Sequence, residues 1–310
     1  MLPRSCSSPA STTMQIPESS YRQLYDFTPH FAEIGHHQMH YIDEGSGAPV
    51  VMLHGNPSWS FMYRDLVRTI KPRHRVIAPD HIGCGLSDKP SDERYIYNLN
   101  QRIEDLEELL EKLELRRNIT LVVHDWGGLI GAGYAVRHPE KISRLVILNS
   151  AAFNVPNGKE IHWALRFCSR SPFACLMMER MNAFSVGATL LGVRKRRMNP
   201  KIRKAYLAPY RNAECRRAVV RFVQDIPFDE NHITNRTIQE ISDSLYLLNK
   251  KPMLICWGER DFVFDLDFLR EWQRRFPRAN IKRFPEAGHY VLEDESEAVC
   301  SLIDNFLRRH

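Results

Sequence analysis

The sequence contains no apolar run long enough to cross a membrane. A bilayer-spanning helix needs about 20 consecutive apolar residues, whereas apolar runs such as residues 145–148 are short and stand between charged residues. The amino end also lacks the apolar stretch of a secretory signal and is rich in Ser, Thr and Pro. We therefore expect a soluble protein with a flexible extension over residues 1–30.

The sequence also lacks the paired cysteines of a disulfide framework or a zinc site. It has seven cysteines, an odd number, and no two of them form a Cys-x-x-Cys pair. A reducing cytoplasm is the expected location for such a chain. No motif for a metal or an organic cofactor occurs, so we expect neither.

Basic charge is concentrated in one internal segment. The chain carries 43 Lys and Arg against 37 Asp and Glu, and residues 153–249 hold 16 of the former and 8 of the latter. The densest part is the basic run at residues 194–204. It fits a solvated face, a docking site for an acidic pathway enzyme, or an anionic membrane surface. Binding of nucleic acid is not expected, because no nucleic-acid module accompanies the charge.

Short apolar runs alternate with amphipathic stretches over residues 31–148 and again after residue 250. The predicted strands are nearly continuous in apolar character, as in a parallel sheet buried on both faces. They cover residues 50–53, 76–79, 119–123, 145–148, 253–257 and 281–284. The pattern predicts a mostly parallel, doubly wound α/β sheet.

Between the two alternating regions the sequence reads as helices broken by prolines. We therefore divide the chain into a core of residues 31–152 and 250–310 and an inserted helical cap of residues 153–249. The oligomeric state is left open.

The segment Val122-Val123-His124-Asp125-Trp126-Gly127-Gly128 follows a predicted strand and opens a helix. A sharp strand-to-helix turn with glycines just beyond is the context of a nucleophile elbow. Asp125 occupies the nucleophile position, where Ser is usual. The alternative is an ordinary helix cap, because Asp is favoured there.

Three other strand ends carry matching signals. Asn56 lies after the first strand, in the region where an oxyanion hole forms, Asp261 follows a later strand, and His289 follows the last. The order Asp125, Asp261, His289 is nucleophile, acid, base, as in an α/β-hydrolase triad. Asn56 and the indole of Trp126 are candidate donors to a leaving group or an oxyanion.

An aspartate nucleophile narrows the reaction. A carboxylate that attacks carbon leaves an ester or an anhydride, which a neighbouring His can help to resolve. Alkyl halides, epoxides and strained lactones are therefore the expected substrates.

At these residues the sequence resembles the haloalkane dehalogenase group of α/β-hydrolases, which shares HGNP and HDWGG. A wider set of motifs is similar to one narrower family, the bacterial β-lactone decarboxylases of long-chain olefin biosynthesis. These motifs are HGNPSWSFMYR, APDHIGCGLSDKP, NAFSVGATLLGV, YLAPY, RFVQDIP, WGERDFVFD and AGHYVLED. The resemblance implies cleavage of a cis-3,4-dialkyl β-lactone to a cis-alkene and CO2, with Asp125 as nucleophile, His289 as base and Asp261 as its partner. Assembly with other enzymes of olefin biosynthesis is a further implication.

The resemblance leaves several points open. Arg64 matches a dehalogenase arginine that usually follows Trp, but Tyr63 stands before it here. Some dehalogenases place the acid where this chain has Asn149, and an amide cannot serve as that acid. Asp125 could attack either the lactone carbonyl or the ring alkyl carbon.

The cap is expected to hold an apolar channel for two alkyl arms. Ordinary cap packing is the alternative for each candidate lining residue. The candidates are Phe167, Phe173, Leu176, Met177, Met178, Met181 and Phe184.

Three other functions compete with the decarboxylase. A haloalkane dehalogenase would use the same residues. An epoxide hydrolase would need two cap tyrosines over Asp125, for which Tyr206 and Tyr210 are candidates. A non-catalytic scaffold should have lost a triad member, and none is lost.

Overall fold

A central eight-stranded sheet forms the body of the molecule in this computed structural model, which describes residues 18–156, 159, 161–229 and 231–310. The strand order is β1-β2-β4-β3-β5-β6-β7-β8. The strands are β1 (His30–Ile34), β2 (His37–Glu44), β3 (Ala48–Leu53), β4 (His74–Pro79), β5 (Ile119–Asp125), β6 (Ile142–Ser150), β7 (Met253–Gly258) and β8 (Asn280–Phe284). From β4 to β8 the neighbouring strands run parallel, whereas β1 and β2 pair antiparallel. The predicted mostly parallel sheet is confirmed.

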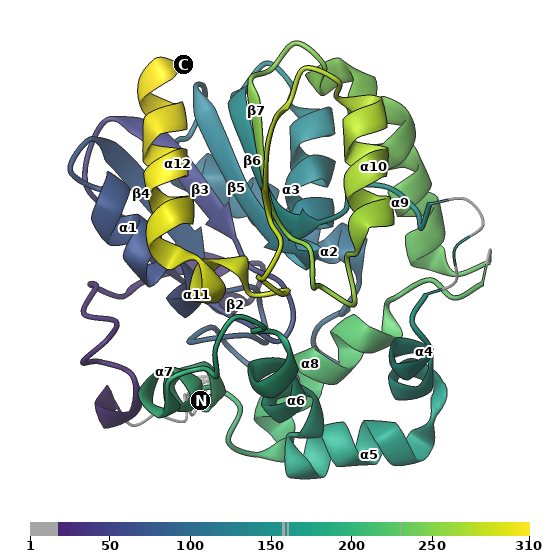
Figure 1. Cartoon of the computed structure of the whole chain (residues 1–310). Coiled ribbons are helices and arrows are strands. Elements are labelled where there is room, and N and C mark those ends of the chain that lie inside the picture. Colours follow the sequence, from purple (N-terminus) through teal and green to yellow (C-terminus); the bar gives the residue numbers. More distant parts are fainter. Residues whose placement is uncertain (1–17, 157–158, 160, 230) are drawn as a thin grey trace, which may run out of the picture.

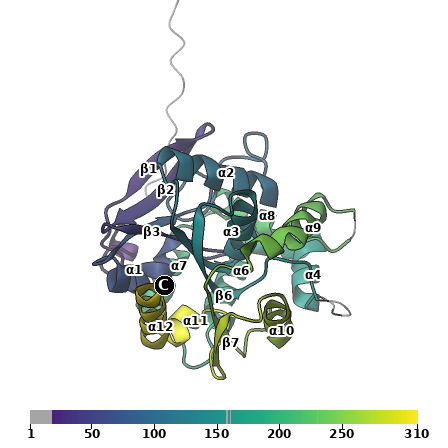
Figure 2. The ribbon, with the colours of Figure 1, turned by 90° about the horizontal axis from the view of Figure 1, so that it is seen from above.

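Helices cover both faces of this sheet (Figures 1 and 2). The α2, α3, α9 and α10 helices pack on one face, and α1, α11 and α12 pack on the other. Their bounds are α1 (Arg64–Ile70), α2 (Leu99–Lys112), α3 (Trp126–Arg137), α9 (Ile233–Ser244), α10 (Leu266–Arg275), α11 (Val291–Asp294) and α12 (Ser296–Arg309). An apolar core lies on each face of the sheet, and alternate residues of β3 point into one or the other. Val51 and Leu53 face the core under α2 and α3, whereas Val50 and Met52 face the core under α1 and α12. Burial on both faces explains the continuous apolar runs.

Five helices lie beyond the carboxyl ends of the strands, at the bottom of Figure 1. They are α4 (Trp163–Arg170), α5 (Pro172–Met181), α6 (Ala183–Leu191), α7 (Pro200–Leu207) and α8 (Ala213–Gln224). Pro172 and Pro200 are the first residues of α5 and α7, where the missing N–H costs no helical hydrogen bond. These five helices are called the cap below; α9, which lies inside the predicted cap of residues 153–249, packs on the sheet instead.

The structure describes only part of the amino-terminal segment, residues 1–30, that the sequence analysis assigned to a flexible extension. Residues 1–17 lie outside the described part of the chain. From the 3-10 helix η1 (Glu18–Ser20) onward the backbone is packed on the body, and Tyr21, Tyr25 and Phe27 are buried. Tyr21 and Tyr25 pack against Trp59, with ring centroids 5.5 and 5.1 Å away. Aromatic side chains in this polar segment supply the apolar contact area that fixes it to the core.

Candidate active site

Asp125 lies at the sharp turn between β5 and α3, as the elbow pattern predicts. Its φ of 53° and ψ of −127° are unusual for a residue with a side chain. The following glycines allow this turn to pack closely. A Cβ on Gly127 would lie 2.0 Å from the Leu53 carbonyl oxygen, and one on Gly128 would lie 1.8 Å from Ser150 Oγ. Asp125 makes no side-chain cap to the helix, so the helix-cap interpretation fails.

Two backbone N–H groups hold the carboxylate of Asp125. The Asn56 backbone N–H donates to Asp125 Oδ1 over 2.7 Å, and the Trp126 backbone N–H also donates to this carboxylate. The other oxygen, Oδ2, lies 3.8 Å from His289 Nε2. Burial raises the pKa of Asp125 above its usual value, against the lowering effects of His289 and the two N–H donors. One oxygen of the Asp125 carboxylate is therefore fixed, and the other faces the imidazole of His289.

His289 is held by Asp261, as the sequence predicts. Its Nδ1 lies 2.8 Å from Asp261 Oδ2, and its ring stacks on Phe264 with centroids 6.0 Å apart. Burial lowers the pKa of His289, but the carboxylates of Asp261 and Asp125 outweigh burial, so the pKa lies above its usual value. The imidazole can therefore carry a positive charge beside Asp125.

Asn149 has a positioning role that the sequence analysis missed. Its Nδ2 donates to Asp261 Oδ2 over 3.0 Å, and its Oδ1 accepts from the Gly258 N–H over 2.8 Å. The Val263 N–H donates to Asp261 Oδ1 over 2.7 Å. The Asn149 amide, which cannot itself act as an acid, thus orients the Asp261 carboxylate. Its place at the end of a predicted strand was the available signal.

Asn56 and Trp126 lie beside Asp125, where the sequence placed them. The Asn56 side chain reaches the cap, with Nδ2 donating to the Val219 carbonyl of α8 over 3.1 Å, while its buried Oδ1 has no hydrogen-bond partner among the described residues. The Trp126 ring packs against Phe222 of α8, with centroids 5.5 Å apart. Both donors thus lie between the nucleophile and the cap.

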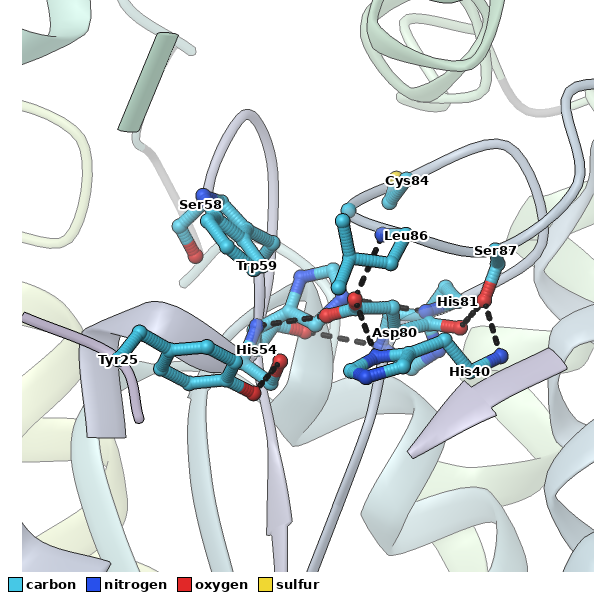
Figure 3. A network of polar contacts seen from close by, with 12 residues as sticks. Tyr25, His40, His54, Ser58, Trp59, Asp80, His81, Cys84, Leu86 and Ser87 are labelled. Atoms are coloured by element: carbon cyan, nitrogen blue, oxygen red, sulfur yellow. Dashed lines mark hydrogen bonds and ion pairs between the residues drawn. The ribbon is translucent and has the colours of Figure 1, made fainter. Parts of the chain in front are cut away.

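A buried polar network supports the turn that carries Asn56 (Figure 3). Asp80 accepts from the Ser60 N–H over 2.7 Å and the Leu86 N–H over 2.8 Å, and lies 2.8 Å from His40 Nδ1. The charge of His40 and these hydrogen bonds outweigh burial and hold the pKa of Asp80 well below its usual value. Asp80 therefore acts as an ionised clamp on the segment after β3. The sequence analysis missed it because nothing in the run APDHIG marks the Asp as paired.

Comparisons with known proteins show the family of this chain. Residues 48–172 match the family described as the alpha/beta hydrolase fold. The chain is 49% identical over 284 residues to the cis-3-alkyl-4-alkyloxetan-2-one decarboxylase of Shewanella oneidensis, covering 92% of this chain and 89% of that protein. It is 43% identical over 294 residues to the enzyme of the same name from Xanthomonas campestris pv. campestris, covering 92% and 98%. This chain belongs to the cis-3-alkyl-4-alkyloxetan-2-one decarboxylase family.

More distant similarity leads to the dehalogenases, as the shared motifs suggest. Haloalkane dehalogenase 2 of Mycobacterium tuberculosis is 29% identical, with 91% of this chain and 95% of that protein covered. The crystal structure of haloalkane dehalogenase DatA from Agrobacterium tumefaciens C58 has a TM-score of 0.81 at 23% identity, with 91% and 96% covered. The predicted α/β-hydrolase fold is confirmed, and this member of the decarboxylase family is an enzyme of that superfamily.

The role of Arg64, left open by the sequence, is structural. Arg64 forms a buried bidentate pair with Glu293, with N–O distances of 2.6 and 2.8 Å. The Tyr206 hydroxyl of the cap donates to the same Glu293 over 2.7 Å. The Tyr210 hydroxyl donates to the Ser58 carbonyl over 3.0 Å. Neither tyrosine is placed to protonate an epoxide at Asp125, which removes the epoxide hydrolase interpretation.

The candidate lining residues of the cap divide between cap packing and the surface. Met178 is buried, but four of the seven candidates are at least half exposed to solvent, so they do not line an enclosed channel. The four are Phe167, Phe173, Leu176 and Met181. The triad itself is enclosed, with Asp125, Asp261 and His289 each less than a tenth exposed.

Proposed function

We propose that this enzyme converts cis-3,4-dialkyl β-lactones to cis-alkenes and CO2 in long-chain olefin biosynthesis, by covalent catalysis at Asp125. The carboxylate of Asp125 carries the proposal, because one oxygen is fixed by backbone donors and the other faces His289 at 3.8 Å. The names of the two relatives supply the substrate class.

The geometry favours attack at the ring carbon that bears the ring oxygen. In serine hydrolases the backbone N–H groups at the elbow bind the oxyanion formed from the substrate carbonyl. Here the Asn56 N–H already donates to Asp125 Oδ1, and a hydrogen bond from the Trp126 N–H lowers the pKa of the same carboxyl. A substrate oxyanion would have to do without them, so attack at the lactone carbonyl loses its main stabilisation.

Attack at the alkyl carbon also accounts for the products. Asp125 Oδ2 forms a bond to the ring carbon while the carbon–oxygen bond of the ring breaks, and the ring oxygen leaves as part of a free carboxylate. That carboxylate then loses CO2, and its electron pair forms the double bond as the ester bond to Asp125 breaks. The nucleophile is regenerated, and no water, oxidant or proton is consumed. Inversion in the first step and anti elimination in the second give a cis-alkene from a cis-lactone.

The other site residues act on the charges that develop. Asn56 Nδ2 and the Trp126 indole are donors for the carboxylate freed in the first step. A positively charged His289, supported by Asp261, helps the Asp125 carboxylate to leave in the second step. Attack at the carbonyl, in contrast, would give a mixed anhydride, and water would convert this anhydride to a β-hydroxy acid.

The test compares two substrates on the same purified protein. We expect a synthetic cis-3,4-dialkyl β-lactone to give a cis-alkene, measured by gas chromatography, and a 1-bromoalkane to give little or no bromide. Asp125→Asn should abolish alkene formation, with mass spectrometry excluding deamidation back to Asp. Bromide without alkene would identify a haloalkane dehalogenase and refute the proposal.

A further inference from the structure

Seven exposed apolar side chains lie on neighbouring helices of the cap, and together they are called here the apolar cap face. It lies on three neighbouring helices, α4, α5 and α6, along the bottom of Figure 1. Its members are all at least half exposed: Trp163, Phe167, Phe173, Leu176, Met181, Leu190 and Leu191. Large exposed apolar patches on folded domains usually mark an interaction site.

Basic side chains border this face. Directly after α6, Arg194, Lys195, Arg196 and Arg197 are all exposed, and Lys201 and Lys204 follow on α7. Lys195 pairs with Glu295. Within the described part of the chain, no acidic side chain forms an ion pair with Arg196, Arg197, Lys201 or Lys204. These four positive charges are therefore not neutralised by acidic side chains among the described residues, and they are available to an anionic binding partner.

The border is fixed to the loop that carries His289. Asp294 accepts hydrogen bonds from the backbone N–H groups of Arg194 and Lys195 over 2.9 and 3.0 Å, and from that of Gly288 over 2.8 Å. The Tyr290 N–H donates to the Gly192 carbonyl over 2.9 Å. The basic border thus starts at the active-site loop.

We propose that the apolar cap face and its basic border dock this enzyme on an anionic lipid membrane. Exposed aromatic and leucine side chains beside unpaired Arg and Lys match a surface that is anionic outside and apolar inside. Among the described residues no helix is long and apolar enough to span a bilayer, so contact is peripheral. Lipid docking also suits a water-insoluble substrate, a consideration that rests on the proposed function. An acidic protein would match the charges but leave the exposed Trp and Phe rings without a partner.

Trp163 provides an internal reporter for this contact. It is 74% exposed, whereas Trp59, Trp126, Trp257 and Trp272, the other four of the five tryptophans, are at most 8% exposed. The experiment titrates the full-length protein with vesicles of phosphatidylcholine alone or with 30% phosphatidylglycerol. We expect a blue shift of tryptophan fluorescence and co-sedimentation only with the anionic vesicles. Brominated lipids should quench the emission, and Trp163→Phe should remove the shift while binding persists.

Charge-reversal variants test the basic border. Arg196→Glu with Arg197→Glu should weaken partition to anionic vesicles roughly 30-fold or more, because each basic residue near the surface contributes about fivefold. The matched control is Arg116→Glu with Arg117→Glu, which changes net charge equally at exposed positions just before β5, at the opposite end of the sheet. This control should bind within about threefold of the parent. Leu190→Ser with Leu191→Ser should weaken binding, whereas Phe31→Ser, at a half-exposed position on β1, should not.

Several outcomes would overturn the proposal. It fails if anionic vesicles do not bind the protein, if both charge-reversal pairs weaken binding equally, or if Trp163 keeps its emission in the bound state. A concentration-dependent dimer in sedimentation velocity that Leu190→Ser with Leu191→Ser abolishes would assign the face to a second copy instead. None of these readouts depends on turnover, so failure of docking and failure of the proposed reaction are distinguishable.

Discussion

Removing Glu293 tests how much its buried ion pair with Arg64, which the cap residue Tyr206 also contacts, contributes to the stability of the fold. The side chains of Arg64 and Glu293 are 5% and 6% exposed, and their pairing is bidentate. Burial lowers the pKa of Arg64, but Glu293 outweighs it, so the guanidinium stays charged. Glu293→Ala would leave that charge buried and unpaired, and would strand the Tyr206 hydroxyl of the cap.

The expected cost is about 3–5 kcal/mol of the free energy of unfolding, the usual loss when one partner of a buried pair is removed. Urea titration followed by circular dichroism measures it. Arg64→Met combined with Glu293→Leu should recover most of the loss, because no unpaired charge is then buried. Glu240→Ala, which breaks an exposed pair with Arg236, is the control and should change little. A loss below about 1 kcal/mol for Glu293→Ala would refute the reasoning.

Three further predictions concern the triad. Gly55→Ala places a Cβ 2.0 Å from Asp125 Oδ1, so activity should fall about 10–100-fold. The control is Gly187→Ala, whose Cβ would have no atom within 4 Å and should leave turnover unchanged. Equal effects of the two variants in steady-state assays would contradict this. Asp261→Asn removes the charge that raises the pKa of His289, and turnover should fall roughly tenfold for each pKa unit lost. NMR titration of the imidazole measures the pKa of His289 in the variant. An unchanged pKa would refute the prediction. Burial raises the pKa of Asp125, and only its ionised form attacks. The turnover rate should therefore begin to fall, as the pH is lowered, at a pH above the usual Asp pKa. A rate that stays constant down to the usual Asp pKa would be evidence against this.

The sequence predicted the six parallel strands well and the first two poorly. A run such as 119–123 is apolar throughout because β5 is buried on both faces. In β2, exposed Gln38 and buried Met39 lie between two histidines, His37 and His40, which hides the apolar signal of a strand. The extension was assigned too many residues for a related reason: Tyr25 and Phe27 are aromatic anchors inside a polar stretch.

The triad was predictable because each member follows a strand, and parallel strands end at one edge of the sheet. Its supports were not, because Asn149 and Asp80 act through hydrogen bonds to backbone and side-chain groups that are distant in sequence. Whether a cap residue such as Phe173 is buried or exposed also depends on how the helices pack, and apolar character alone does not determine this.

The most direct test of the central claim is the chemical nature of the adduct on Asp125. Protein mixed with a cis-3,4-dialkyl β-lactone is quenched in acid within milliseconds and digested, and the peptide with Asp125 is weighed by mass spectrometry. His289→Gln, which should slow the second step, serves to accumulate the adduct. We predict that the peptide gains the mass of the whole lactone and keeps it in neutral hydroxylamine, as an alkyl ester does. A hydroxamate on Asp125 would show carbonyl attack, and alkene formation with no adduct on Asp125 would contradict the account.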